Sequence, residues 1–154
     1  IFMNYKIYLM IKVICVSGSV GSGKTTYAKK LAKGLKYRYI DVNKVIDENK
    51  LKEKYDRSRK TYEVDVKKLN KALIKLIKES KENLVMDGHL SHYLPKEYVS
   101  NVVILKCDLK KLRNRLKKRG YSEKKIRENL EAEIFDVCYE EAKELGHKIE
   151  VIES

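Results

Sequence analysis

Residues 18–25 read Gly18-Ser19-Val20-Gly21-Ser22-Gly23-Lys24-Thr25 and match the phosphate-binding loop pattern G-x-x-x-x-G-K-[ST] throughout. Glycines let backbone N–H groups converge on phosphate oxygens, which bulkier side chains would prevent. In this pattern Lys24 supplies positive charge to the β- and γ-phosphates, and the Thr25 hydroxyl is a ligand for Mg²⁺. The stretch therefore predicts a site for a nucleoside triphosphate and its metal ion.

The residues on either side of the loop support this prediction. Residues 11–16 form an apolar run typical of a buried strand, and residues 26–32 have apolar side chains at helical spacing. A strand, a glycine-rich loop and a helix in this order aim the helix N-terminus at an anion. An ordinary glycine-rich turn is the competing interpretation, and the flanking pattern makes it the weaker one.

Strand and helix patterns alternate along all 154 residues. This alternation predicts a single α/β domain, a three-layer α/β/α sandwich around a five-stranded parallel sheet. The charged segment 52–60 has weak periodicity and is expected to be flexible. The expected strands lie near residues 11–16, 37–41, 84–86, 102–105 and 149–152, and the expected helices near 24–35, 41–50, 66–77, 109–116 and 126–138.

Composition limits the class of protein. The chain is 43% hydrophobic, enough for one core, and no stretch is long enough to span a membrane. The apolar run 7–16 continues into the phosphate loop, so we interpret it as a strand and not a cleaved signal, with residues before Met10 as an extension outside the core. Cys15, Cys107 and Cys138 lack metal-ligand or disulfide spacing, and we expect a reducing, cytoplasmic location.

The net charge of +13 has two interpretations that the sequence leaves open. A strongly basic protein attracts polyanions through counterion release, which favours contact with RNA or the ribosome. Lysine-rich surfaces also occur in heat-adapted proteins without any nucleic-acid role. Several lysines between residues 67 and 78 lie opposite an apolar helical stripe, as on a solvated helix face.

Candidate polar residues follow the predicted strand 84–86. Asp87 comes directly after it, where phosphate-loop enzymes keep an acidic residue near Mg²⁺, although a turn or a helix cap would also place an aspartate there. His89 follows two residues later and His92 after it. Spacing alone leaves both histidines open between a functional and a structural role.

Arg115 and Arg119 lie four residues apart and share one face of a predicted helix. Planar guanidinium groups suit the spread charge of a transferring phosphoryl group, whereas a basic surface face is the plainer alternative. Gly120 ends this helix and opens a short polar stretch, residues 121–125, that we interpret as a lid. A GTPase is excluded because residues 43–46 lack the acid of N-K-x-D, and Asp87 does not begin D-x-x-G.

With these residues assembled, the chain resembles the adenylate kinase isoenzyme 6 family. The longest matching stretch is residues 112–129, which continues through 131–134 to 140–142. The segment 85–92 matches the D-x-H motif of the family, and residues 18–26 match its loop. The resemblance covers about residues 11–152.

The resemblance implies one nucleoside monophosphate kinase domain over residues 1–154, with ATP and Mg²⁺ as cofactors and AMP or another monophosphate as acceptor. Residues 10–41 would form the phosphate-loop core, 41–64 the segment that binds the monophosphate, and 118–128 a short lid. The residues implied for ATP are Gly21, Gly23, Lys24, Thr25, Thr26 and Arg119; those for the metal are Thr25 and Asp87; those for catalysis are Lys24, Asp87, His89, Arg115 and Arg119.

The family is also linked to maturation of the small ribosomal subunit. This implies a small-subunit ribosomal protein and precursor rRNA as partners, ATPase activity, and a second hypothesis of an ATP-switched assembly factor with incidental kinase activity. A small-molecule kinase of the shikimate kinase kind is a weaker third hypothesis. We expect a monomer.

Two departures from the family pattern bear on the acceptor. Residues 43–48 lack the arginine that usually holds the monophosphate, and Lys44, Arg57 or Arg59 would have to replace it. The sequence stops at Ser154, where relatives usually continue into a further helix, so we expect a less covered sheet face.

Overall fold

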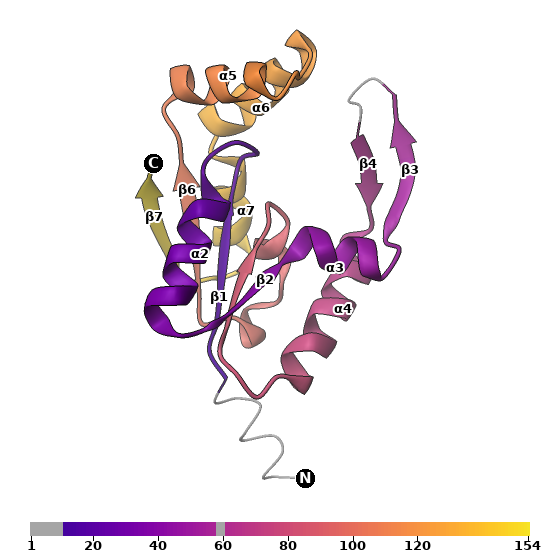
Figure 1. Cartoon of the computed structure of the whole chain (residues 1–154), viewed down its shortest axis with the longest axis vertical. Coiled ribbons are helices and arrows are strands. Elements are labelled where there is room, and N and C mark those ends of the chain that lie inside the picture. Colours follow the sequence, from indigo (N-terminus) through magenta and orange to yellow (C-terminus); the bar gives the residue numbers. More distant parts are fainter. Residues whose placement is uncertain (1–10, 58–60) are drawn as a thin grey trace.

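The computed structural model describes residues 11–57 and 61–154 of the chain. Five strands form one parallel sheet in the order β2-β5-β1-β6-β7 (Figure 1). The expected five-stranded parallel sheet is therefore confirmed. The strands are β1 (Val13–Gly18), β2 (Arg38–Asp41), β5 (Leu84–Asp87), β6 (Asn101–Lys106) and β7 (Ile149–Glu153).

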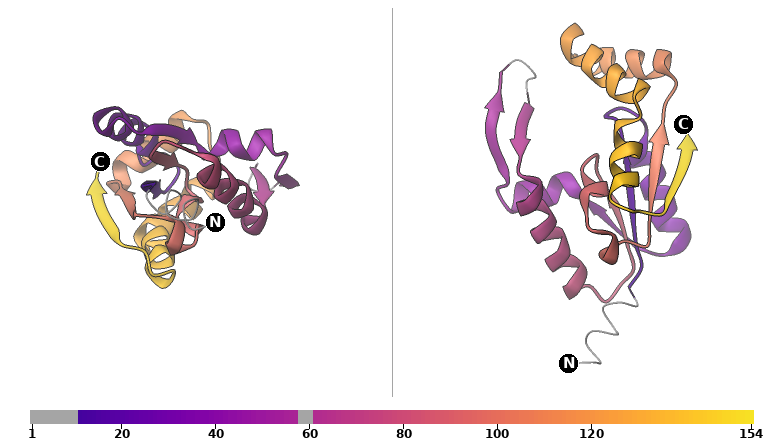
Figure 2. Two further views of the ribbon diagram at one scale, coloured as in Figure 1. Left: turned by 90° about the horizontal axis from the view of Figure 1, so that it is seen from below. Right: turned by 180° about the vertical axis from the view of Figure 1, so that it is seen from behind.

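Helices cover both faces of this sheet. Strand residues alternate between the faces, so Val13 and Cys15 join one apolar cluster and Val16 joins another. The first cluster includes residues of α3 (Val42–Glu48), α4 (Val66–Glu79) and α7 (Val137–Glu144), and the second includes Ala28 and Ala32 of α2 (Lys24–Leu35). Figures 1 and 2 show α2 and α7 on opposite sides of the sheet, which makes the three layers.

A third apolar cluster lies beside the phosphate loop. It joins α5 (Leu109–Lys118) to α6 (Glu123–Ile134) through Leu112, Leu116 and Ile126, and Val20 of the loop packs against it. Both helices begin with a side-chain cap, since Asp108 and Ser122 accept bonds from backbone N–H groups of Lys111 and Lys125. This basic helix pair therefore lies over the carboxyl ends of the strands (Figure 1).

The expectation of a flexible segment at residues 52–60 is wrong for its described part. Strands β3 (Lys52–Asp56) and β4 (Thr61–Val64) form an antiparallel hairpin that projects from the body of the protein (Figure 1). Tyr55 and Tyr62 face each other with ring centroids 4.9 Å apart, and both remain about half exposed. Because the hairpin buries no apolar stripe, alternation gave no signal for it.

The predicted helix 126–138 is divided in the structure. Asp136 has a left-handed φ of 52° between the end of α6 and the start of α7. Lys106 at the end of β6 binds both the Glu133 carbonyl oxygen, at 2.7 Å, and the Asp136 carboxylate. These long-range contacts stabilise the break, and the local sequence pattern continues across it.

Two short 3₁₀ helices, η1 (Ser91–Tyr93) and η2 (Lys96–Tyr98), connect β5 to β6. β1 extends two residues beyond the expected strand because Gly18 still pairs with Leu105 of β6. The expected extension before Met10 lies outside the described residues. Within residues 11–57 and 61–154, none of the helices combines the length and the apolar character needed to cross a bilayer.

Candidate active site

The phosphate loop connects β1 to α2 at the carboxyl edge of the sheet. Gly23 precedes α2 with a left-handed φ of 91°, which an L side chain rarely adopts. A Cβ at Gly18 would lie 2.6 Å from the backbone oxygen of Leu105, so the strand could not lie so close to β6 with any other residue. The loop therefore needs glycine to exist in this shape.

The loop is also fastened from behind by side chains. Arg115 Nη1 donates to the Gly21 carbonyl oxygen at 3.0 Å and approaches the Cys107 sulfur at 3.3 Å. Ser154 Oγ donates to the Ser22 carbonyl oxygen at 2.7 Å. These bonds fix the carbonyl oxygens of Gly21 and Ser22 in place.

A cavity of about 540 Å³ opens in front of the loop. Five residues that the sequence singled out line it together, although they come from the loop, the end of β5 and the end of α5. They are Lys24, Thr25, Asp87, His89 and Arg119. Val20, Asn43, Gly88, Tyr121, Lys125, Glu128 and Asn129 complete the lining.

Lys24 carries its ammonium group in this cavity. Burial lowers its pKa, the nearby carboxylate of Asp87 opposes that shift, and the charge of Arg119 adds to it. With Lys125 and Glu128, three cationic and two carboxylate side chains therefore line a space large enough for a polyphosphate. The positive excess favours a polyanionic ligand.

Asp87 is 3% exposed, and its two carboxylate oxygens differ in their surroundings. Oδ2 accepts a hydrogen bond of 2.5 Å from the Tyr39 hydroxyl, whereas buried Oδ1 has no hydrogen-bond partner among the described residues. An orphaned buried carboxylate oxygen is costly unless something binds it. Thr25 lines the same cavity. A hydroxyl and one carboxylate suit Mg²⁺, which prefers oxygen ligands and keeps waters and substrate phosphates for its other positions.

His89 lies exposed in the cavity opening, yet its pKa falls to about 4. Partial desolvation by the surrounding protein is the larger cause, and the positive charge of Lys24 follows. His89 is therefore neutral near pH 7. A neutral imidazole can donate or accept a hydrogen bond to a phosphate or a water but adds no charge.

The remaining predicted residues do not line this cavity. Arg115 lies behind the loop on the Gly21 carbonyl oxygen, while Arg119, one turn further along, lines the cavity itself. Gly21 and Gly23 shape the loop, and exposed Thr26 lies in the first turn of α2. Their contacts with ATP stay predictions.

A second cavity of about 600 Å³ lies between the hairpin and the site. It shares Asn43 and His89 with the first, so the two spaces are contiguous. Tyr55 and Tyr62 of the hairpin line it, together with Ile46, Asp47, Lys52, Asp56, Glu63, Val64 and Leu90. Lys44 and Arg57, two predicted substitutes for the missing arginine, are absent from this lining, and Arg59 lies outside the described residues.

His92 is buried under the site and has a structural environment. Its Nδ1 lies 2.7 Å from Ser17 Oγ and its Nε2 lies 3.1 Å from Glu141 Oε1 on α7. Ser17 Oγ is also 3.2 Å from the His89 carbonyl oxygen. This chain of contacts joins α7 to the base of the phosphate loop.

The sequence did not single out three residues of the site. Tyr39 of β2 contacts Asp87, while Asn43 and Lys125 line the cavity. Asn43 lies in the predicted monophosphate segment and Lys125 in the predicted lid, but neither was named as a site residue. Tyr39 belongs to no motif, and its contact with Asp87 depends on the pairing of β2 with β5.

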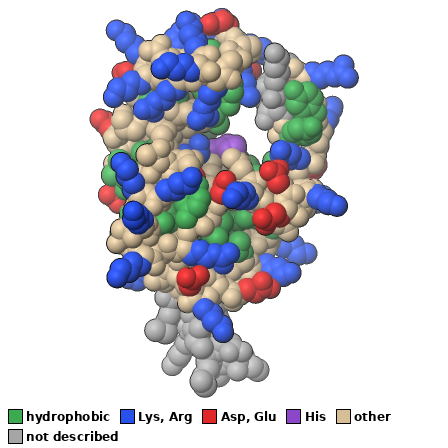
Figure 3. Space-filling model, in the orientation of Figure 1, with side chains coloured by type: hydrophobic (Ala, Val, Ile, Leu, Met, Phe, Trp, Pro, Cys, Tyr) green, Lys and Arg blue, Asp and Glu red, His purple; other side chains and the backbone are tan. Residues whose placement is uncertain are grey.

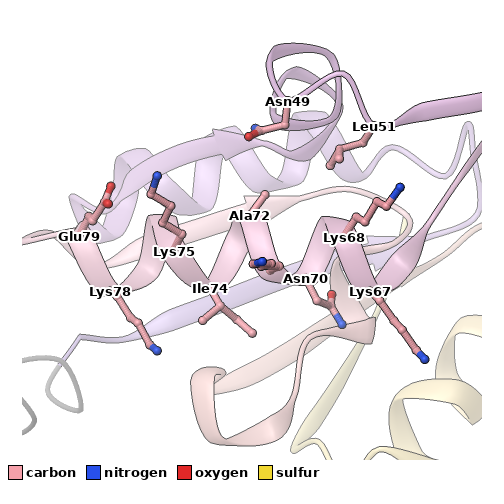
Figure 4. Close-up of a pocket in the computed structure, with 11 residues that line it drawn as sticks. Asn49, Leu51, Lys67, Lys68, Asn70, Ala72, Ile74, Lys75, Lys78 and Glu79 are labelled. Carbon is pink, nitrogen blue, oxygen red and sulfur yellow. The ribbon is translucent and has the colours of Figure 1, made fainter.

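A cavity of about 920 Å³, larger than the two at the site, lies elsewhere. It runs over the outer face of α4 beside Leu51, with a floor of Ala72 and Ile74 and a rim of lysines (Figure 4). None of the predicted site residues lines it. Size alone would therefore have pointed to the wrong place.

Comparison with known proteins gives concordant results. A protein-family model described as an AAA domain matches residues 14–136. A protein of Methanocaldococcus jannaschii, named "Putative adenylate kinase", is 37% identical over 137 residues, which cover 89% of this chain and 75% of that protein. The "Adenylate kinase isoenzyme 6 homolog" of Schizosaccharomyces pombe is 40% identical over 132 residues, 85% of this chain and 74% of its own.

Solved structures agree on the fold. The shikimate kinase of Acinetobacter baumannii in complex with shikimate superimposes with a TM-score of 0.64, at 18% identity, over 97% of this chain and 87% of that one. A gluconokinase of Sinorhizobium meliloti gives a TM-score of 0.57 at 15% identity, over 92% and 82% of the two chains. At such identities the likeness concerns the fold alone.

Proposed function

Because the chain belongs to the family that includes the adenylate kinase isoenzyme 6 homologues, we propose that it is an ATP-dependent nucleoside monophosphate kinase of the adenylate kinase type. The proposal depends above all on one observation, the shared cavity of Lys24, Asp87 and Arg119. The contiguous second cavity supports it, since two nucleotides need two adjoining spaces.

We assign the triphosphate tail of ATP to the first cavity. Backbone N–H groups of the loop bind its oxygens, Lys24 adds charge at the γ-phosphate, and Arg119 approaches from the opposite side. Arg115 acts from behind, by fixing the Gly21 carbonyl oxygen. Gly21, Gly23 and Thr26 complete the proposed ATP site.

Thr25 and Asp87 are the proposed ligands of Mg²⁺, for which buried Oδ1 of Asp87 is the supporting observation. When bound, the ion neutralises charge on the β- and γ-phosphate oxygens. His89, neutral at pH 7, is positioned to hydrogen-bond the transferring group or a water.

In the proposed reaction, a phosphate oxygen of the acceptor attacks the γ-phosphorus. The bond to the β–γ bridging oxygen breaks, and ADP leaves with the electron pair. No general base is required because the attacking oxygen is already anionic. Lys24 and Arg119 therefore act by alignment and charge neutralisation, and exclusion of water limits ATP hydrolysis.

The hairpin cavity favours a second candidate function. Asp47, Asp56 and Glu63 line it, and Lys52 is the one lysine or arginine among its described lining residues. Lys52 already pairs with Asp47 at 3.0 Å. Carboxylates repel an acceptor phosphate. This supports an ATP-switched assembly factor that binds a basic small-subunit ribosomal protein, with incidental kinase activity.

One coupled assay separates the two functions. ADP formation is measured with Mg·ATP, with and without AMP. Strong acceleration by AMP supports the kinase, and equal rates support the ATPase switch. Lys24→Ala should abolish both activities. The control is Lys33→Ala, which replaces an exposed lysine in the last turn of α2 and should change neither activity. Full activity of Lys24→Ala would contradict the proposed site.

A further inference from the structure

The hydroxyl of Tyr39 lies between the two proposed metal ligands. It donates to Asp87 Oδ2 at 2.5 Å, and the Thr25 side chain lies close enough to lower the Tyr39 pKa, against the larger effects of burial and Asp87 that raise it. Asp87 and Thr25 come from different elements, the end of β5 and the start of α2. Tyr39, from β2, is therefore a bridge between them.

The proton positions in this bridge follow from its chemistry. A carboxylate can only accept, so the Tyr39 proton must point at Asp87 Oδ2. The Tyr39 oxygen keeps its lone pairs and can only accept, so in any contact between the two side chains the Thr25 hydroxyl is the donor. The chain runs Thr25 O–H to Tyr39 O–H to Asp87. It turns the Thr25 proton away and leaves the lone pairs of Thr25 and the unpartnered Oδ1 of Asp87 available for a cation.

The fold holds Tyr39 firmly enough for this task. β2 and β5 are parallel neighbours with Tyr39 opposite Val85, so Asp87 lies two residues further along on the same face. The ring packs with the apolar cluster under α2, and Lys29 Nζ lies 5.6 Å from the ring centroid. Packing therefore limits the rotation of the ring, so that few other positions are open to the hydroxyl group.

We propose that Tyr39 is a positioning residue for the metal ion, because its hydroxyl orients Thr25 and Asp87 so that each presents an oxygen to the cation. The inference rests on the proposed function, which requires a nucleotide-bound Mg²⁺ here. Tyr39 contacts the proposed metal ligands and does not line the nucleotide cavity itself. Its effect should therefore appear in metal dependence and not in nucleotide affinity as such.

The test is the substitution Tyr39→Phe, which removes the hydroxyl and keeps the ring. Calorimetry measures the dissociation constant of a non-hydrolysable imido analogue of ATP, once with excess Mg²⁺ and once with EDTA. The ratio of the two constants reports the gain due to the metal. We expect Tyr39→Phe to lower this gain about tenfold, the usual effect of losing a residue that orients metal ligands, with the EDTA value within about twofold of wild type.

Two controls isolate the hydroxyl. Tyr37→Phe makes the same change on a tyrosine that packs in the same cluster and lies outside the described lining of the cavity. It should leave the gain unchanged. In an Asp87→Asn background, Tyr39→Phe should have little further effect, because its target carboxylate is gone.

Three results would overturn the inference. The first is a ratio of dissociation constants in Tyr39→Phe that equals the wild-type ratio; this result would leave the proposed kinase function intact. The second is an equal loss of affinity in EDTA and in Mg²⁺, which would make Tyr39 a packing residue. The third is a wild-type protein whose binding does not depend on Mg²⁺, which would remove the proposed metal site as well.

Discussion

His92 has ring partners that determine its protonation. Nε2 faces the Glu141 carboxylate, an acceptor, so Nε2 carries the hydrogen, and in the neutral ring Nδ1 accepts from Ser17. Burial lowers the His92 pKa; the hydrogen bond and charge of Glu141 oppose the shift, and His147 adds to it. The ring is therefore neutral in the folded protein at pH 7.

This arrangement predicts a pH dependence of stability. The folded pKa of His92 lies below its value of about 6.5 in an unfolded chain, so the unfolded state binds more protons as the pH falls below 6.5. The free energy of unfolding should then be lower at pH 5.5 than at pH 7.5. In His92→Gln this difference should shrink, by at most about 1.4 kcal/mol for one group with a strongly lowered folded pKa.

Urea denaturation at the two pH values measures both quantities. His89, whose pKa shift has the same sign, is present in both proteins, and the charge of His92 is the smallest cause of that shift, so the difference between them reports mainly on His92. An identical pH dependence in the two proteins would exclude His92 as its source.

At the residue scale, motifs and spacing identified five of the twelve residues that line the cavity. Lys24 and Thr25 were identified by their places in the loop, Asp87 and His89 by their place after a strand, and Arg119 by helix spacing. Tyr39 was missed because its partner lies 48 residues away, across a strand pairing that no local pattern encodes. The sequence also could not predict that Arg115 contacts the Gly21 carbonyl oxygen and not the cavity. Two residues four positions apart share a helix face, but the spacing does not tell which neighbours each one contacts.

Elements whose apolar side chains face the core were predicted well. α4 follows the expected pattern, with Leu69, Leu73 and Ile77 buried at spacings of four, and Asp65 caps it by accepting from the Lys67 and Lys68 N–H groups. The β3–β4 hairpin and the α6–α7 break were missed. Their stability comes from a cross-strand tyrosine pair and from Lys106, and neither produces periodicity.

The contacts of Lys106 lead to a prediction about the α6–α7 junction. Its ammonium group lies 2.6 Å from Glu133 Oε1, and the Glu133 side chain is 4% exposed. Lys106→Met would leave a buried carboxylate without its cation. We expect the free energy of unfolding to fall by about 2–3 kcal/mol, less than for a fully buried ion pair, because Lys106 itself is partly exposed. Chemical denaturation measures this loss.

Two further variants test the cause. Lys106→Met combined with Glu133→Gln should recover part of the stability, since the unpaired charge is removed. Arg113→Met breaks an ion pair with Glu123 whose partners are both exposed, and it should cost less than about 1 kcal/mol. Equal losses in Lys106→Met and Arg113→Met would contradict the argument from burial.

At the scale of the whole molecule, the +13 charge is distributed over most of the visible surface. Figure 3 shows lysine and arginine side chains over both the sheet body and the upper helices, with fewer acidic groups between them. The strand–helix alternation was enough to predict the fold class. The distribution of charge could not be predicted in this way, because it depends on which helix faces remain in contact with solvent.

The charge predicts binding of single-stranded RNA with a strong salt dependence. Anisotropy of a labelled oligonucleotide should show affinity falling about tenfold or more between 50 and 200 mM salt, as released counterions require for several phosphate contacts. Binding that does not weaken with salt would contradict this mechanism. No binding at low salt would instead favour a solvated, heat-adapted surface.

The attachment of α5 to the phosphate loop separates stationary from movable parts of the upper molecule. A Cβ at Gly21 would lie 3.3 Å from carbon atoms of Leu112 and Leu116, and Arg115 holds the same residue through its carbonyl oxygen. α5 therefore cannot swing away without disrupting the loop. Gly120 has a φ of 77° with open space around it and can act as a pivot. Closure over a nucleotide then falls to the turn beyond Lys118 and to the hairpin opposite, while α5 stays in place.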